Sequence, residues 1–299
     1  MKAAPFEYAR ARTLGEACAL LGEHGDDAKV IAGGQSLVPM LAMRLLAPAW
    51  LIDVAHLAEL NDISDSVSAG QLTVGAMTRQ STAAASAMLL DAVPLIGKAL
   101  RWVGHTATRN RGTIGGSLVH ADPSAELPLV AVLLNATLDL RSVRGVRHIA
   151  ARDFFTGPMM TATAPDECLV DIHFPVWENG RTGSAFDEIA TRHGDFAIVA
   201  AAAQMTLDAH GTCTRAELAI GGASPAPLAF ADLANTLVGA RPDDQLLRDV
   251  ARQAAARVEP SNDLQATAAY RSHLAGVLAE RVLRGARSDA ARSATEKLQ

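Results

Sequence analysis

The hydrophobic and polar positions of the first 55 residues follow a helix period in one place and form short apolar runs in two others. Thr13, with Glu16 three residues later, is typical of a capped helix start, and the apolar residues that follow recur at helical spacing until Gly25. The apolar runs at residues 30–32 and 50–54 have the length of buried strands. This stretch therefore predicts a small unit of the β-α-β kind.

Between residues 56 and 176 the pattern changes to shorter segments separated by turn residues. Asp122 followed by Pro123 is typical of a helix start, because an acidic side chain can cap the first turn and proline fits its first position. Thr78 is expected to cap another helix. The pattern predicts strands near residues 63–75, where Ala69–Gly70 forms a turn, and at residues 137–140 and 168–174. It also predicts a helix over residues 91–103. This second unit is of the α+β class.

A loop-like composition around residues 177–183 predicts a domain boundary. Beyond it, the Ala-rich run at residues 196–207 is expected to be a strand, with helix as the competing interpretation, and residues 213–220 are its expected partner. Amphipathic helices are expected over residues 243–258 and 264–283. The chain is thereby divided into residues 1–55, 56–176, 177–285 and a tail, 286–299, which is expected to be frayed.

Two glycine pairs share the same local chemistry. Gly33–Gly34 follows a predicted strand and precedes Ser36, which is placed to cap a helix that begins at Leu37. Gly115–Gly116 is likewise preceded by an apolar residue and followed by a hydroxyl residue, Ser117. Glycine turns before a helix can aim backbone N–H groups at an anion. One such turn could be a plain tight connection, but two suggest a ligand with two phosphates, such as a pyrophosphate-bearing dinucleotide.

Composition narrows the classes of function. The 299 residues carry a formal net charge of −5, which disfavours a nucleic-acid surface or an anionic membrane surface. Cys18, Cys168 and Cys213 are far apart and the nine histidines form no ligand pair, so this chain is expected to hold neither an iron–sulfur cluster nor another metal. No apolar run is long enough to span a membrane, and residues 1–7 lack the apolar core of a signal peptide, so a cytoplasmic location is expected.

The two glycine segments resemble those of one protein family. The stretches are Ala-Gly-Gly-Gln-Ser-Leu at residues 32–37 and Arg-Asn-Arg-Gly-Thr-Ile-Gly-Gly-Ser-Leu at residues 109–118, followed by His-Ala-Asp-Pro-Ser-Ala-Glu-Leu-Pro at residues 120–128. They are similar to the FAD-binding medium subunits of the molybdenum hydroxylases, the xanthine dehydrogenase and carbon monoxide dehydrogenase group. Residues 192–197 and 262–274 resemble the C-terminal flavoprotein domain of that family, so the resemblance covers nearly the whole chain.

The resemblance implies a bilobal α+β fold of the FAD-binding PCMH type, as in vanillyl-alcohol oxidase, followed by a C-terminal α+β domain like that of the carbon monoxide dehydrogenase flavoprotein. A Rossmann domain is not implied, and neither glycine pair has the G-x-G-x-x-G spacing. The implied activity is that of an oxidoreductase subunit. A large partner holds the molybdenum cofactor and hydroxylates the substrate, a small partner holds two [2Fe-2S] clusters, and FAD on this chain passes the electrons to an outside acceptor. A dimer of heterotrimers is the implied assembly.

The resemblance also assigns cofactor contacts to positions of this chain. Residues 32–36 and 113–117 would line the diphosphate, and Asp122 or Glu126 would accept hydrogen bonds from the ribityl hydroxyls, although Asp122 could equally be a plain helix cap. Leu169 would pack near a flavin ring. No catalytic acid, base or nucleophile is implied, because flavin carries the chemistry. The implied cofactor-binding residues are Val30, Ile31, Ala32, Gly33, Gly34, Gln35, Ser36, Leu37, Val103, Thr113, Ile114, Gly115, Gly116, Ser117, Asp122, Glu126 and Leu169.

Other interpretations stay open at this point. Arg109 and Arg111 could neutralise phosphate or face solvent, and His105 and His120 are interpreted as structural. Gln35 stands where some relatives have histidine or threonine, which favours an aldehyde or N-heterocycle hydroxylase over one for carbon monoxide; a purine is also open. The alternatives to the electron-transfer subunit are a self-standing FAD-dependent oxidoreductase and, from another class, a nucleotide-binding scaffold without a redox role.

Overall fold

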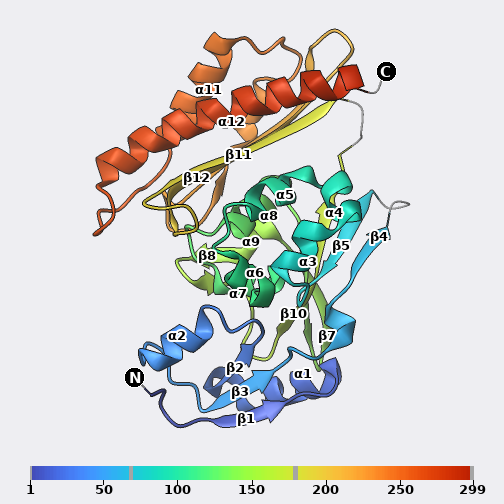
Figure 1. The fold of residues 1–299 in the computed structure, drawn as a ribbon, viewed down its shortest axis with the longest axis vertical. Coiled ribbons are helices and arrows are strands. Elements are labelled where there is room, and N and C mark those ends of the chain that lie inside the picture. The colour runs from blue at the N-terminus through green and yellow to red at the C-terminus, as the bar shows by residue number, and fades with distance from the viewer. Residues whose placement is uncertain (1, 67–69, 178–180, 297–299) are drawn as a thin grey trace.

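The computed structural model describes residues 2–66, 70–177 and 181–296, which form three units arranged along the longest axis of the molecule (Figure 1). The turn expected at Ala69–Gly70 and the boundary expected around residues 177–183 fall partly outside these residues. The N-terminal unit lies at one end, a middle unit carries most of the short helices, and the C-terminal unit lies at the other end. The mixture of helix and strand confirms the α+β class.

The N-terminal unit is a parallel three-stranded sheet with the order β1-β3-β2. The central strand has the sequence Trp-Leu-Ile-Asp, and its Leu51 and Ile52 are buried. The first helix starts as predicted, since the Thr13 hydroxyl oxygen accepts from the Glu16 N–H at 3.1 Å, and Gly25 ends the helix. The elements are β1 (Glu7–Arg10), α1 (Leu14–His24), η1 (Gly25–Asp27), β2 (Ala28–Ile31), α2 (Leu37–Ala42), β3 (Trp50–Asp53) and η2 (Ala58–Leu60).

The middle unit is built on a five-stranded antiparallel sheet with the order β4-β5-β10-β6-β7. Helix α8 is its core element, because every residue of this helix is buried, as the apolar run from Leu127 to Leu134 requires. The strands are β4 (Ile63–Ser66), β5 (Gln71–Gly75), β6 (Thr137–Ser142), β7 (Gly145–Ala150) and β10 (Cys168–Pro175), with β8 (Phe155–Gly157) and β9 (Met160–Thr161) in a separate small sheet. The helices are α3 (Gln80–Ala85), α4 (Ala87–Ala92), α5 (Pro94–Leu100), α6 (Thr106–Arg111), α7 (Ile114–His120), α8 (Glu126–Leu134) and α9 (Ala151–Phe154).

The C-terminal unit is a four-stranded antiparallel sheet with the order β11-β12-β13-β14. The Ala-rich run forms strand β12, in which Ala200 and Ala202 belong to the core of the middle unit and Ala201 and Ala203 to the core under α12. The long helix α12 therefore covers one face of the sheet, and α5 and α8 pack on the other (Figure 1). The elements are β11 (Thr182–Ala190), β12 (Ala197–Leu207), β13 (Cys213–Gly221), β14 (Leu228–Ala229), α10 (Ala231–Asn235), α11 (Asp244–Ala255) and α12 (Ala268–Glu296).

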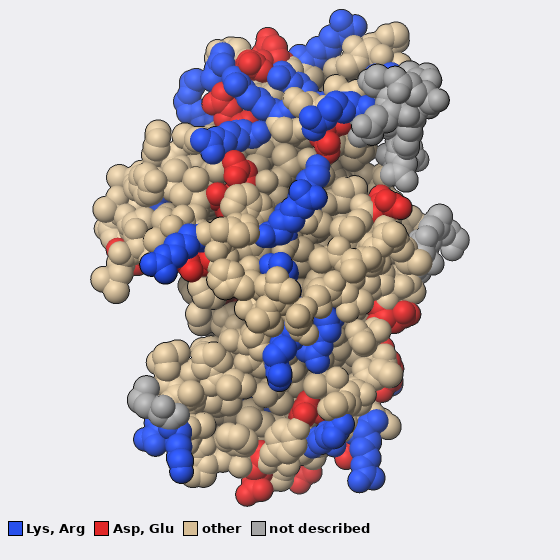
Figure 2. Space-filling view, viewed as in Figure 1, with Lys and Arg blue, Asp and Glu red and all other residues tan. Residues whose placement is uncertain are grey.

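The outer helices of the C-terminal unit carry both signs of charge, which Figure 2 shows as interspersed basic and acidic side chains at this end of the molecule. Arg284 of α12 pairs with Asp244 of α11 at 3.2 Å and with Glu280 at 2.9 Å, and Arg287 pairs with Asp244 at 2.8 Å. Exposed ion pairs contribute only about 0–1 kcal/mol each. These ion pairs connect α11 to α12, but they contribute less to stability than the buried apolar contacts between the two helices.

The helices of the middle unit differ from the sequence prediction in two places. Pro94 splits the helix expected over residues 91–103 into α4 and α5, because proline has no N–H for the helical ladder and suits only a first turn. Thr78 does not cap a helix: its hydroxyl donates to the Asp62 carbonyl oxygen at 3.2 Å, and α3 begins at Gln80. A tertiary hydrogen bond has replaced the local one.

Two side chains of the glycine-containing segments also do not cap the helices that follow them. The Ser36 hydroxyl makes no capping bond, and its backbone already has helical dihedral angles. The Asp122 carboxylate accepts from the Ser124 N–H at 2.9 Å in a local turn, and α8 begins only at Glu126. Both prediction errors come from the same cause, because a short polar side chain can bond a turn as readily as a helix end.

The expected fraying after Gly285 is wrong, because α12 continues to the end of the described chain. Ala286 and Ala290 are buried, and a Cβ at Gly183 of β11 would lie 2.0 Å from the Ala290 nitrogen. The contact is made by small residues that let strand and helix approach closely. A pattern of large apolar residues, on which the prediction relied, does not show such a contact.

Replacing Gly183 by alanine is expected to lower the free energy of unfolding by about 1–3 kcal/mol, because the new methyl group would overlap the α12 backbone. Gly15→Ala in α1 is the matched control, since its Cβ would meet only the Thr13 hydroxyl at 3.8 Å. That change should stabilise the chain by about 0.5–1 kcal/mol. Urea unfolding measures both, and a Gly183→Ala protein as stable as the wild type would contradict the packing of α12 on β11.

Candidate functional site

The structure brings the two glycine segments into direct contact. An added Cβ at Gly33 would lie 2.2 Å from the Arg111 carbonyl oxygen and 2.9 Å from the Gly112 Cα. An added Cβ at Gly116 would lie 3.9 Å from the Ala32 Cβ. Backbones approach this closely only where a side chain is missing. The contact joins the N-terminal unit to the middle unit, because each segment comes from a different unit.

The second segment is anchored to the loop between β5 and α3. The N–H groups of Ile114 and Gly115 donate to carbonyl oxygens of that loop at 3.0 Å and 2.9 Å. An added Cβ at Gly115 would lie 2.5 Å from the Ala76 Cβ, so this glycine serves packing. The Gly116 N–H donates to the Thr113 hydroxyl oxygen at 3.0 Å, which caps α7. The amides of this segment are thus bonded within the chain.

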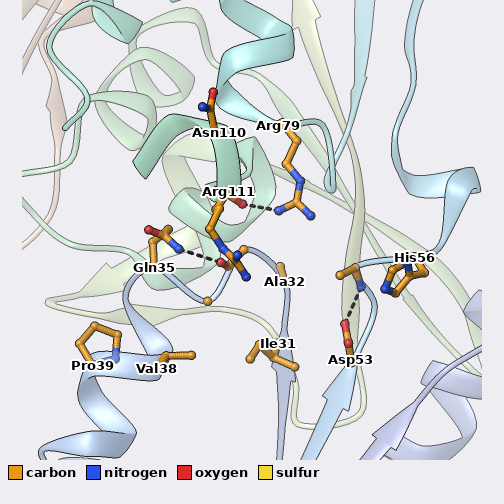
Figure 3. Close-up of a pocket in the computed structure, with 13 residues that line it drawn as sticks. Ile31, Ala32, Gln35, Val38, Pro39, Asp53, His56, Arg79, Asn110 and Arg111 are labelled. Carbon is orange, nitrogen blue, oxygen red and sulfur yellow. Dashed lines mark hydrogen bonds between the residues drawn. The ribbon is translucent and has the colours of Figure 1, made fainter. Parts of the chain in front are cut away.

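The first segment leaves its amides open. In residues 2–66, 70–177 and 181–296, no acceptor is bonded to the N–H groups of residues 33–36. Gly34 has a φ of 71°, in the left-handed region that favours glycine, and turns the backbone into α2. The Gln35 side-chain amide donates to the Gly33 carbonyl oxygen at 3.1 Å (Figure 3). The two glycine pairs are therefore not equivalent donor sets, and the open N–H groups belong to the first.

A cleft of about 730 Å³ opens beside these amides (Figure 3). Arg79 and Arg111 both line it, and the Arg79 guanidinium donates to the Arg111 carbonyl oxygen. Burial, and then the charge of Arg111, lower the pKa of Arg79. Open amides beside two guanidinium groups fit a diphosphate. The lining residues are Ile31, Ala32, Gly33, Gly34, Gln35, Val38, Pro39, Asp53, Ala55, His56, Arg79, Asn110 and Arg111.

Asp53, at the end of β3, supplies negative charge at the side of the cleft where His56 lies (Figure 3). One carboxylate oxygen accepts from the Ala55 N–H at 2.8 Å, and the other accepts from the Tyr8 hydroxyl. That second bond raises the pKa of Tyr8. A carboxylate repels phosphate but accepts from hydroxyl groups, so this side of the cleft suits a sugar.

Of the predicted contacts, residues 31–35 line the cleft, whereas Val30, Ser36, Leu37, residues 113–117, Val103, Asp122, Glu126 and Leu169 do not. Asp122 and Glu126 follow α7, whose seven residues span about 10 Å, and so are placed at its far end from the glycine pair. Glu126 is 8% exposed, and burial raises its pKa to about 7. Val103 and Leu169 belong to the hydrophobic core of the middle unit. The structure thus separates the predicted positions into the glycine segments, a group beyond α7, and core residues.

Sequence reasoning missed part of the cleft. Arg79 reaches it because its backbone bridges to Thr113, a tertiary contact without a local signal. Asn110 immediately precedes Arg111 in the second segment, and its place in that motif could have been used to find it. Arg109 neither lines the cleft nor faces solvent freely, because its guanidinium donates to carbonyl oxygens of the loop before α6 at 2.8 Å and 2.9 Å.

The described residues contain no cluster of three or more His, Cys, Asp or Glu side chains that could hold a metal ion. The three cysteines are buried, and burial raises the pKa of Cys168 to about 12 and of Cys213 to about 11. Thiols of this kind are poor nucleophiles and poor ligands. Across the described helices, none combines the length and hydropathy that a bilayer span needs.

Two family models match consecutive parts of the chain. Residues 4–177 match the FAD binding domain in molybdopterin dehydrogenase, and residues 184–286 match the CO dehydrogenase flavoprotein C-terminal domain. The chain belongs to the FAD-binding medium subunits of the molybdenum hydroxylases. Membership of this medium-subunit family confirms the resemblance, the fold, FAD as the cofactor and the assignment to an oxidoreductase.

Similarity to known medium subunits runs along nearly the whole chain. The alpha subunit of the 6-hydroxypseudooxynicotine dehydrogenase complex of Paenarthrobacter nicotinovorans is 35% identical, over 95% of both chains. The carbon monoxide dehydrogenase medium chain of Hydrogenophaga pseudoflava is 33% identical, over 94% of this chain and 96% of that one. The solved structure of quinoline 2-oxidoreductase from Pseudomonas putida 86 matches with a TM-score of 0.90 and 37% identity, over 97% of this chain and 99% of that one.

Gly33→Ala is expected to lower FAD affinity at least tenfold, about 1.4 kcal/mol, because the methyl group would separate the glycine segments. Gly22→Ala in α1 is the control, since its Cβ would lie 4.0 Å from the nearest atom of Val143, an ordinary contact. Titration of flavin-free protein with FAD, followed by fluorescence, gives both dissociation constants. Equal constants for the two variants would contradict a role of this contact in binding.

Proposed function

We propose that this chain is the FAD-carrying electron-transfer subunit of a heteromeric molybdenum hydroxylase. It receives electrons from [2Fe-2S] clusters of a partner, after a substrate has been hydroxylated at another partner's molybdenum site, and delivers them to an external acceptor. The observation that supports this most is the combination of open N–H groups at residues 33–36 with the guanidinium groups of Arg79 and Arg111, in an FAD-binding fold.

The first glycine segment is the principal holder of the diphosphate in this proposal. Residues 32–36 line the diphosphate, and the N–H groups of residues 33–36 are the donors. The missing side chain of Gly33 lets the Arg111 backbone approach, and the positive φ of Gly34 turns the chain into α2. Hydrogen bonds to a charged oxygen are roughly twice as strong as neutral ones. The second segment, residues 113–117, does not line the cleft but packs beside the first, since an added Cβ at Gly116 would lie 3.9 Å from the Ala32 Cβ. It is proposed to reach the diphosphate through the Ser117 hydroxyl, while the amides of residues 114–117 keep their bonds within the chain.

The ribityl chain is proposed to follow α7 from the cleft toward the C-terminal unit. Gly115 and Gly116 lie in the first turn of α7, and Asp122 and Glu126 follow the other end of this helix, where their carboxyl oxygens can accept from ribityl hydroxyls. When bound, flavin supplies the redox chemistry, and the side chains bind and orient it. The apolar positions assigned to flanking contacts are Val30, Ile31, Leu37, Val103, Ile114 and Leu169.

The proposed partners are a large subunit with the molybdenum cofactor and a small subunit with two [2Fe-2S] clusters, in a dimer of heterotrimers. Relatives named as a medium chain, or as one subunit of a complex, support such an assembly. They also favour this function over a self-standing oxidoreductase, since they match over almost their entire length. The cytoplasmic location stays a prediction.

The purified chain is expected to carry flavin absorption bands that bleach with dithionite, because the proposed site binds a redox-active flavin. The spectrum before and after reduction, with flavin quantified after heat release, makes the measurement. A nucleotide-binding scaffold would purify without these bands. A chain that binds ADP but never flavin would overturn the proposal.

Affinity purification of the chain from its native cells is expected to yield a complex with molybdenum, iron and two further polypeptides. Metal analysis and mass spectrometry of the purified complex make the measurement. Recovery of the chain by itself, with full substrate-oxidising activity and bound FAD, would support the self-standing oxidoreductase instead.

A further inference from the structure

Two carboxylic side chains are buried between the middle unit and the C-terminal unit. Glu126 opens α8 and is 8% exposed, and Glu188 of β11 is 3% exposed. Within the described residues, neither carboxylate oxygen of Glu188 has a hydrogen-bond partner. An ionised carboxylate without any donor is strongly disfavoured inside a protein, so this side chain requires a proton or a partner that neutralises it.

The sheet register shows which way Glu188 points. Glu188 pairs with Ala200, and Ala200 pairs with Gly221 on the next strand. Residues paired across strands project from the same face of a sheet. An added Cβ at Gly221 would lie 3.4 Å from the Pro123 carbonyl oxygen, just before α8. Glu188 therefore faces the turn and helix start where Glu126 lies.

Two cations next to this sheet, Lys98 and Arg152, are engaged with other carboxylates. Lys98 of α5 binds the Asp289 carboxylate at 2.6 Å, and Arg152 of α9 binds the Glu217 carboxylate at 2.7 Å. Neither is bonded to Glu188, whose oxygens have no partner in the described chain. A proton is then the simplest way to remove the charge of Glu188.

Neighbouring acids act in the same direction. Burial, with added repulsion from Glu126 and Asp187, raises the pKa of Glu188 to about 8. Burial, with added repulsion from Asp122, raises the pKa of Glu126 to about 7. Two buried carboxyl groups that repel each other do not both ionise near neutral pH.

We propose that Glu126 and Glu188 hold one proton between them across the interface, so that Glu188 stays a neutral carboxylic acid and the pair carries a single negative charge, on Glu126. Glu188 is then a positioning residue: it lets the Glu126 carboxylate keep its place at the start of α8. The consequence for flavin binding rests on the proposed function, in which Glu126 accepts from the ribityl chain. The shared proton itself does not.

Infrared spectroscopy of the full chain without FAD tests the proton directly. Between pH 7 and pH 8 the wild type is expected to show the C=O stretch of a protonated carboxylic acid, and Glu188→Gln should remove most of it, leaving the part that belongs to Glu126. Asp187→Asn is the matched control, because Asp187 neighbours Glu188 in sequence but its carboxylate faces Arg281 at 3.4 Å. That variant should keep the band. Absence of the band in the wild type, or its persistence at full intensity in Glu188→Gln, would overturn the proposal.

The pH dependence of stability gives a second readout. Both folded-state pKa values lie above the ordinary 4.5, so the folded chain binds protons more tightly than the unfolded chain. The stabilisation is complete below pH 4.5 and is lost as the pH rises through about 8. The Tm of the wild type should fall between pH 6 and pH 9. In Glu188→Gln the decrease in Tm over the same range should be at most half as large. An unchanged fall in Glu188→Gln would contradict the shared proton.

FAD titrations separate positioning from simple packing. The wild type should lose about tenfold in affinity between pH 7, where Glu126 is partly ionised and Glu188 is protonated, and pH 9, about 1.4 kcal/mol. Glu188→Gln, a neutral isostere, should bind at pH 9 as tightly as the wild type does at pH 7, whereas Glu188→Ala should be weak at both pH values. Equal behaviour of Gln and Ala variants would contradict the positioning role. If the wild type binds no FAD at all, the proposed function fails, and the infrared band and the Tm profile still decide on the proton.

Discussion

The approach of Gly33 to the Arg111–Gly112 backbone is the contact on which the candidate site depends. It is close enough that a single methyl group would collide with a carbonyl oxygen, at 2.2 Å. The N-terminal sheet and the middle sheet share no strand among the described residues. A hydrophobic cluster joins the two units, because Cys168 and Val170 of β10 pack with residues of α1, and the glycine contact adds a second connection beside the cleft. The contact sets the open amides of residues 33–36 beside the guanidinium groups of the other unit.

Much of the fold could be predicted because strong apolar patterns and glycine pairs act locally. The apolar run of α8 predicts a helix and the alternating pattern of β10 predicts a strand, and the structure has both. Strand β1 was not, because the sequence Glu-Tyr-Ala-Arg has no buried face and becomes a strand only through its register with β3. The last turns of α12 were missed for a related reason, since alanine at Ala286 and Ala290 fills a narrow gap without a hydrophobic signal.

The candidate site was predictable as a pair of segments but not as an arrangement of donors. The glycine pairs are visible in the sequence, whereas Arg79 and Asp53 join the cleft from segments that share no motif with them. The difference between the two pairs was also hidden. It arises because the loop at Ala76 accepts the amide bonds of the second pair, and only the folded backbone shows that acceptor. Buried acids such as Glu188 are equally invisible, because burial is a property of the whole interface.

The unequal hydrogen bonding of the two glycine pairs has a consequence for maturation of the flavoprotein. The pair on the middle unit completes its backbone bonding with acceptors of its own polypeptide, so that half of the cradle needs no nucleotide to take its final form. In the part of the chain that the structure describes, the amides of residues 33–36 are without an acceptor and are free to bond one from outside. An incoming nucleotide would therefore meet a middle-unit segment whose amides at residues 114–117 are already bonded, and an N-terminal loop whose amides at residues 33–36 still have donors to offer.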